Sequence, residues 1–249
     1  MKKLIYILLS LLIFACDSEN ADDCFQKTGS IIQNEITVDT FDKILVNRDI
    51  ELIIKEGTTQ KLVIETGKNL IHDVEAKVTD GKLILTDNNT CNYVRDYGVT
   101  KVHVTAPNIS EIRSSTQYDV SSDGVLTYPS LTILSEDFNS SEAFTVGNFK
   151  LEIDNANFRV VFNNLSNCFV SGKTNNLDIG FFAGTTTRFE GQNLVAQNVQ
   201  IYTRSSNDII VNPQAKIAGT ITGTGDVISV STPPVIAVDE LYKGRLIFR

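Results

Sequence analysis

The chain has 249 residues, of which 42% are hydrophobic, and a formal net charge of −8. This hydrophobic content is typical of a protein with a packed core, so the composition excludes a wholly disordered chain. The acidic balance and the lack of a Lys/Arg cluster argue against nucleic-acid binding, because such a surface repels phosphate backbones.

The first 16 residues have the features of a secretory signal that ends at a lipid-attachment site. Lys2 and Lys3 precede the apolar run Leu4-Ile5-Tyr6-Ile7-Leu8-Leu9, which with its continuation is shorter than the roughly 20 residues of a membrane-spanning helix. The end of the segment, Phe14-Ala15-Cys16, resembles a bacterial lipobox. The resemblance implies cleavage before Cys16 and lipidation of this residue. We therefore predict a signal peptide over residues 1–15 and a chain held to membrane lipid by the Cys16 acyl chains.

The residues that follow Cys16 are expected to form an acidic stalk, which with its flanks covers residues 16–35. The segment Asp17-Ser18-Glu19-Asn20-Ala21-Asp22-Asp23 is polar and shows no periodicity, as is typical of disordered tethers. Acidic residues directly after the lipid-bearing cysteine also resemble the surface-export signals of Bacteroidota lipoproteins. We expect an outer membrane lipoprotein, and both the periplasmic and the surface-exposed face remain open.

Three cysteines remain once Cys16 is lipidated. Cys24 precedes the first predicted strand and Cys91 lies in a polar loop, so both are expected to be exposed. The cell envelope is oxidising, and a Cys24–Cys91 disulfide is therefore our hypothesis, although sequence alone does not determine connectivity. Cys168 lies in an alternating apolar run and is expected to be a buried, small hydrophobic residue. No Cys-x-x-Cys or paired-histidine spacing indicates a metal site.

Several short runs between residues 44 and 105 alternate between apolar and polar side chains with a period of two, which predicts β-strands. Clear examples are Ile50-Glu51-Leu52-Ile53-Ile54, Lys61-Leu62-Val63-Ile64-Glu65 and Lys101-Val102-His103-Val104-Thr105. Gly57, Gly67, Gly81 and Asp87-Asn88-Asn89 are expected to form the turns between strands. A single short helical turn is expected at residues 69–73. The chain is therefore predicted to be all-β.

From residue 109 onward, apolar–polar–apolar triplets recur about every 20 to 26 residues, and each is followed by a polar elbow and a second short strand. This repeat predicts a β-solenoid, in which stacked coils share one core. An antiparallel sandwich remains the alternative, mainly for the first half. Asparagines are expected to adopt the left-handed backbone at coil corners and to form hydrogen bonds along the stack. They are Asn155, Asn157, Asn163, Asn164, Asn175, Asn176, Asn193 and Asn198.

Several segments resemble the head GIN domain family, which is described as auto-transporter adhesins and is common in Bacteroidota lipoproteins. The matching segments are Phe41-Asp42-Lys43-Ile44-Leu45-Val46, Val78-Thr79-Asp80-Gly81-Lys82-Leu83, Lys101-Val102-His103-Val104-Thr105-Ala106-Pro107 and Gly223-Thr224-Gly225-Asp226-Val227. The resemblance covers residues 36–249. It implies a right-handed parallel β-helix of two similar halves, about 36–108 and 109–249. The family's Gly-Ser-Gly elbows are replaced here by segments such as Ser114-Ser115-Thr116.

The sequence contains no recognisable catalytic motif. It has no nucleophile elbow and no phosphate-binding loop, and no cofactor is expected. Parallel β-helices also support carbohydrate-active enzymes, so a polysaccharide lyase or hydrolase is the alternative function. Such an enzyme needs converging carboxylates. Asp119, Asp208 and Asp226 occupy similar elbow positions and are the candidates, although turn capping is the preferred interpretation.

Aromatic residues recur at similar places in the repeat. They are Tyr118, Phe138, Phe158, Phe181 and Phe182, with Tyr202 nearby. Two interpretations are open: an internal ladder, which is preferred, or an exposed stripe that binds a surface glycan or a protein. We predict a non-enzymatic envelope binding protein, an adhesin or a scaffold. Exposed strand edges at the solenoid ends also make self-association a hypothesis.

Overall fold

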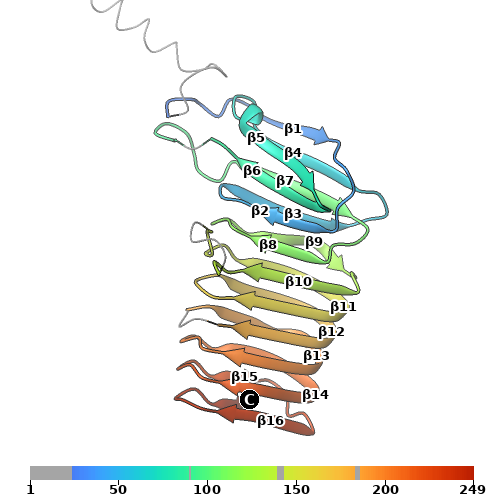
Figure 1. Cartoon of the computed structure of the whole chain (residues 1–249), viewed down its shortest axis with the longest axis vertical. Helices are drawn as coiled ribbons and strands as arrows, with labels where there is room; N and C mark the ends of the chain where they lie inside the picture. The colour runs from blue at the N-terminus through green and yellow to red at the C-terminus, as the bar shows by residue number, and fades with distance from the viewer. Residues whose placement is uncertain (1–23, 90, 139–142, 183–185) are drawn as a thin grey trace, which may run out of the picture.

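The structure is a computed structural model that describes residues 24–89, 91–138, 143–182 and 186–249. The predicted signal peptide and Cys16 lie outside the described residues. The strands stack along the long axis of the molecule, with the N-terminal strands at one end and the C-terminal strands at the other (Figure 1). The described residues contain one short 3-10 helix, η1 (Ile71–Asp73), within the range predicted for a helical turn. The prediction of an all-β protein is confirmed.

The part of the chain that the structure describes contains 17 strands, which form one sheet. Their bounds are β1 (Ile31–Ile36), β2 (Lys43–Val46), β3 (Ile50–Glu56), β4 (Lys61–Gly67), β5 (Val74–Thr79), β6 (Lys82–Asp87), β7 (Thr100–Ala106), β8 (Glu111–Ser114), β9 (Val120–Leu126), β10 (Ser130–Ser135), β11 (Phe149–Phe162), β12 (Asn167–Phe181), β13 (Arg188–Thr203), β14 (Ile209–Ile221), β15 (Val227–Ser229), β16 (Val235–Glu240) and β17 (Leu246–Phe248). No helix in these described segments is long and apolar enough to cross a bilayer.

The sheet is mixed, so the expectation of a parallel arrangement along the whole chain is wrong. The pairs β1–β4, β4–β7 and β5–β6 are antiparallel. The reason is clearest between β5 and β6, which are joined by Asp80 and Gly81 with φ angles of 51° and 72°. Positive φ at both central residues is the signature of a two-residue type I′ hairpin turn, whereas a parallel connection needs a much longer crossover.

From β8 onward, the strand pairings are parallel and almost in register. Leu131 of β10 lies opposite Phe158 of β11, which is followed by Leu177 of β12, Val199 of β13 and Ile217 of β14. All five side chains are buried. Each coil therefore covers the apolar face of the next, and the recurring triplets form one continuous core.

Asparagines link neighbouring coils through their side chains. The amide of Asn176 donates to Oδ1 of Asn157 at 3.0 Å, and the amide of Asn198 donates to Oδ1 of Asn176 at 3.1 Å. The predicted hydrogen bonding along the stack is confirmed. The expected left-handed backbone is wrong, because within the described segments only Asp49 and Asp80 among non-glycine residues have positive φ. The linked asparagines lie within long, extended strands, where this conformation is not needed.

Candidate functional site

The five aromatic residues predicted to align do not share one face. Phe158 and Phe181 are only 1% and 0% exposed, whereas Phe138 and Phe182 are 57% and 40% exposed. Phe181 is the last residue of β12, and Phe182 directly follows it, with its backbone N–H still donating to the carbonyl of Phe162. Successive side chains along such a chain point to opposite faces, so Phe181 and Phe182 lie on different sides. An exposed stripe that includes Phe158 and Phe181 is therefore wrong, because both belong to the core.

Phe181 is part of an internal ladder. Its ring stacks on that of Phe162, with centroids 5.7 Å apart and planes at 7°, and Phe162 stacks on Phe149 at 5.3 Å and 24°. The preferred interpretation of internal packing therefore holds for Phe181. Its partners Phe149 and Phe162 were not among the predicted aromatic residues, and they take part because the fold brings these three rings together in the core.

A second set of rings lies outside the coils, and we call Phe138, Phe182 and Tyr202 the outer aromatic column. Phe138 contacts Phe182 edge-on at 6.1 Å, and Phe182 stacks on Tyr202 at 5.2 Å and 27°. Gly180 lies opposite Tyr202 in the β12–β13 register. A Cβ atom at Gly180 would lie 2.5 Å from the Phe182 ring, so the missing side chain lets this ring lie against the strand.

Hydrogen bonds hold the base of this column in place. The backbone N–H of Phe138 donates to Oε2 of Glu136 at 2.8 Å, and Glu136 is itself paired with Arg113. The side chain of Asn163 accepts from the backbone N–H of Asp137 at 3.2 Å and donates to the Asp137 carboxylate at 2.6 Å. The outer rings are therefore presented from a fixed backbone.

Tyr118 contributes to a different part of the molecule. Its ring lies against the loop between β6 and β7, where a Cβ atom on Gly98 would be 2.7 Å from the ring. Burial, the nearby Asp49 carboxylate and Tyr97 raise the pKa of Tyr118. Tyr118 is therefore a packing partner of this loop.

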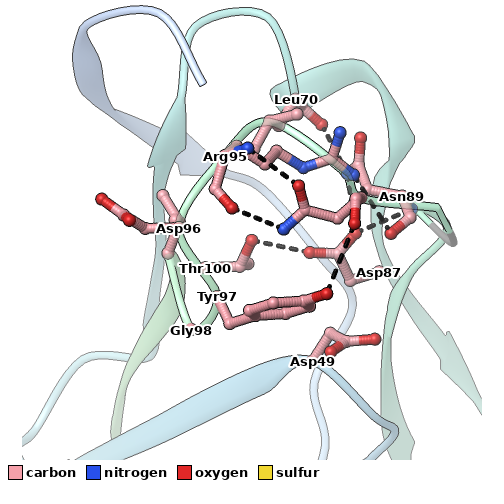
Figure 2. Close-up of a pocket in the computed structure, with 11 residues that line it drawn as sticks. Asp49, Leu70, Asp87, Asn89, Arg95, Asp96, Tyr97, Gly98 and Thr100 are labelled. Atoms are coloured by element: carbon pink, nitrogen blue, oxygen red, sulfur yellow. Dashed lines mark hydrogen bonds between the residues drawn. The ribbon is translucent and has the colours of Figure 1, made fainter. Parts of the chain in front are cut away.

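The same loop borders a small pocket of about 120 Å³ that is open on one side (Figure 2). Asp87 lies in its wall and is only 8% exposed. Its carboxylate accepts from the Thr100 hydroxyl at 2.6 Å and from the backbone and side-chain nitrogens of Asn89 at 2.9 and 2.7 Å. Burial raises the pKa of Asp87, although these donors oppose the shift. The sequence indicated only a turn at Asp87, and nothing in its pattern signalled a buried carboxylate.

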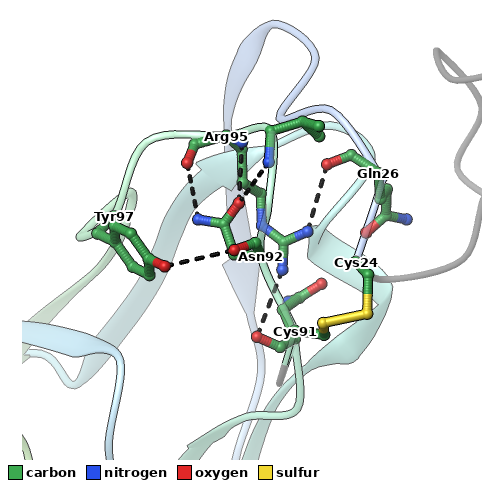
Figure 3. The surroundings of a disulfide bond; sticks show 8 residues. Cys24, Gln26, Cys91, Asn92, Arg95 and Tyr97 are labelled. Carbon is green, nitrogen blue, oxygen red and sulfur yellow. Dashed lines mark hydrogen bonds between the residues drawn. A yellow bond between two sulfur atoms is a disulfide. The ribbon is translucent and has the colours of Figure 1, made fainter.

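A disulfide between Cys24 and Cys91 connects the N-terminal segment to this loop (Figure 3). The Arg95 guanidinium donates to the backbone carbonyls of Gln26 at 3.3 Å and of Asn89 at 3.4 Å. The loop is therefore crosslinked by both a covalent bond and polar contacts. Cys168 is buried and free, as predicted, and burial raises the pKa of its thiol.

The three candidate carboxylates do not form one cluster, because Asp208 and Asp226 lie on neighbouring coils but Asp119 is far from both. Asp119, Asp208 and Asp226 do occupy equivalent positions in the register, but Asp119 is four strand steps from Asp208. At about 4.8 Å per step this separation is roughly 19 Å, beyond the range of a carboxylate pair that acts on one bond. Asp208 accepts from the backbone N–H of Asp226 at 3.0 Å, and Asp226 accepts from that of Arg245 at 2.8 Å. These side chains link successive coils.

Potential metal ligands are scattered as well. Within the described ranges, no group of three His, Cys, Asp or Glu side chains is arranged to hold a metal ion.

Comparison with known proteins agrees with the fold. The chain is similar in structure to a putative adhesin from Bacteroides fragilis NCTC 9343, with a TM-score of 0.78, 18% identity and coverage of 90% of this chain and 99% of that chain. It also resembles a putative lipid binding protein from Parabacteroides distasonis ATCC 8503, with a TM-score of 0.62, 15% identity and coverage of 89% and 98%. At these identities the likeness shows the fold alone. No curated protein matches the chain.

A family model described as "Putative auto-transporter adhesin, head GIN domain" matches residues 40–233, which is most of the chain. The resemblance inferred from the segments around Phe41, Val78 and Lys101 is thereby confirmed. The chain belongs to the head GIN domain family.

Proposed function

We propose that this protein is a lipid-anchored cell-envelope binding protein, an adhesin or scaffold without catalytic activity. In this proposal residues 1–15 are a signal peptide and residues 16–23 a tether that begins at the lipidated Cys16. The predicted stalk extended to residue 35, but Cys24 is bonded to Cys91 and β1 begins at Ile31, so residues 24–35 belong to the folded domain. Residues 36–249 then form a right-handed parallel β-helix with some antiparallel strands near its start. The whole protein is attached to the outer membrane. The lipobox-like segment and membership of an adhesin family support this placement.

The outer aromatic column is the single observation that carries the binding function. Its rings are partly exposed and contact one another, edge-on between Phe138 and Phe182 and stacked between Phe182 and Tyr202, and backbone hydrogen bonds hold Phe138 and Phe182 in place. The faces of aromatic rings are electron-rich and apolar, so they suit the C–H-bearing face of a sugar ring. Because the rings are already ordered, little conformational entropy is lost when a ligand binds. A surface glycan is the ligand class that we assign to the column.

The test compares two variants of the chain from residue 17 onward on an array of bacterial polysaccharides and mucin glycans. Phe182→Ala removes the centre of the column. Phe169→Ala is the matched control, because Phe169 is also 40% exposed and lies at the other end of β12. We expect glycan binding by the wild-type chain and the control, and its loss in Phe182→Ala. Binding that persists in Phe182→Ala, or a wild-type chain that binds no glycan on the array, would refute the assignment.

A further inference from the structure

A second exposed apolar surface lies at the end of the molecule where the N-terminal segment enters. Its members are the exposed apolar side chains of the N-terminal segment and the β6–β7 loop, namely Phe25, Tyr93, Val94 and Tyr97, and we call them together the tether-end surface. Tyr93 and Tyr97 are 74% and 76% exposed, and Phe25 and Val94 are about half exposed. The N-terminal segment and the β6–β7 loop lie together at the upper end in Figure 1, opposite the C-terminal strands.

These side chains stand on a crosslinked scaffold. The backbone N–H of Tyr93 donates to the carbonyl of Cys24 at 2.9 Å, next to the Cys24–Cys91 disulfide. The ring of Tyr93 contacts that of Phe25 at 5.8 Å. The hydroxyl of Tyr97 donates to the carbonyl of Asn92 at 3.3 Å, as Figure 3 shows. The aromatic groups therefore project from a fixed loop, although no other part of the described chain covers them.

The length of the tether limits what this surface can meet. Seven residues separate Cys16 from Cys24. A fully extended chain spans at most about 3.6 Å per residue, so the disulfide lies within roughly 29 Å of the anchored residue. By contrast, β17 lies eight strand steps from β7 along the stack, or about 38 Å further away.

We propose that the tether-end surface docks onto the phospholipid bilayer that holds the Cys16 acyl chains. This inference rests on the proposed lipid anchor. Tyrosine suits the boundary between headgroups and acyl chains, since its ring is apolar and its edge carries a polar hydroxyl, and the Phe25 and Val94 side chains add apolar area. A protein docked in this way has its coils extending away from the membrane. The outer aromatic column, which lies along β10–β13, is then held at a fixed distance from the membrane surface.

The chain contains no tryptophan, so a single introduced tryptophan reports on its own surroundings. The experiment places the full lipidated protein in phosphatidylethanolamine/phosphatidylglycerol vesicles that contain brominated phospholipid, which quenches nearby tryptophan. Tyr97→Trp and Tyr93→Trp place the reporter on the tether-end surface. Tyr242→Trp is the control, because Tyr242 is 54% exposed near the opposite end.

We expect brominated lipid to lower the fluorescence of Tyr97→Trp and Tyr93→Trp by at least twofold and to leave Tyr242→Trp unchanged. Mass analysis of the mature N-terminus on the same samples establishes lipidation at Cys16. If the protein is lipidated but neither Tyr97→Trp nor Tyr93→Trp is quenched, the docking inference is overturned and the anchor is left intact. An unlipidated Cys16 overturns the anchor itself and the docking inference with it.

Discussion

Phe181 and Phe182 are adjacent in sequence, but the structure predicts very different costs when either is replaced by alanine. Phe181 is fully buried and stacks on Phe162 in the internal ladder. Truncation of a buried phenylalanine leaves a cavity, so Phe181→Ala is expected to lower the free energy of unfolding by about 3–5 kcal/mol. Phe182 is 40% exposed, and its removal leaves an open surface that water can fill. Phe182→Ala is therefore expected to cost about 1–2 kcal/mol, mainly from lost contacts with Phe138 and Tyr202.

The two variants are compared with the wild-type chain by urea unfolding followed by circular dichroism. A coil stack can unfold in stages, so the strand signal is recorded over the whole transition before midpoints are compared. The expected order of midpoints, from highest to lowest, is wild type, then Phe182→Ala, then Phe181→Ala. Equal losses for the two variants, or a larger loss for Phe182→Ala, would refute the assignment of these neighbouring rings to the core and to the surface.

Three further predictions concern the backbone, a buried carboxylate and the disulfide. Gly219→Ala should lower the melting temperature far more than Gly124→Ala. Both glycines have positive φ, but a Cβ atom at Gly219 would lie 1.8 Å from a carbonyl oxygen of the neighbouring coil. A Cβ atom at Gly124 would meet nothing within 4 Å. The Gly124→Ala cost should be about 1–2 kcal/mol, and equal shifts would contradict the clash. The raised pKa of Asp87 means that the folded protein favours the protonated carboxyl more than the unfolded chain does. The stabilisation from this group is therefore complete below its unfolded pKa and is lost as the pH rises through the folded pKa. Asp87→Asn should therefore gain stability relative to wild type as the pH rises from about 3.5 to about 7 in urea titrations, and a constant difference would count against a raised pKa. In denaturant, alkylation of the chain from residue 17 should label one cysteine without reductant and three with it; three labelled in both cases would exclude the disulfide. The free energy of unfolding of the Cys24→Ser/Cys91→Ser variant should be lower by up to about 4 kcal/mol, because the disulfide no longer restricts the unfolded chain over a separation of 67 residues.

Much of the fold was predictable because its signals are local. Alternating side chains gave the strands, and the recurring triplets gave the stacked coils from β8 onward. Asn157 and Asn176 could be expected to pair, because residues at equivalent positions of successive coils lie next to each other in the stack. The Asp80-Gly81 dipeptide is typical of a type I′ hairpin turn, but we predicted only a turn between strands there, and the antiparallel β5–β6 pair was therefore missed.

The candidate site was less predictable, because it depends on which side of a strand each residue faces. A shift of one residue in a strand moves a side chain from the core to the surface. The spacing therefore brought Phe181 and Phe182 into one predicted stripe, whereas the structure divides them. The surroundings of Asp87 depend on contacts with Asn89 of the β6–β7 loop and Thr100 of β7, and the tether-end surface depends on contacts between that loop and the N-terminal segment. The nearest sequence signal was the pair Cys24 and Cys91, which were predicted to be exposed but are half-buried and bonded to each other.

The binding function is tested most directly by a titration of the best array glycan into the wild-type chain, Phe182→Ala and Phe169→Ala. Loss of the central ring should weaken binding at least about tenfold, which corresponds to about 1.4 kcal/mol. Phe169→Ala should bind as the wild type does. Equal affinity for all three chains would show that the outer aromatic column does not bind the glycan, and the proposed function would lose the observation that carries it.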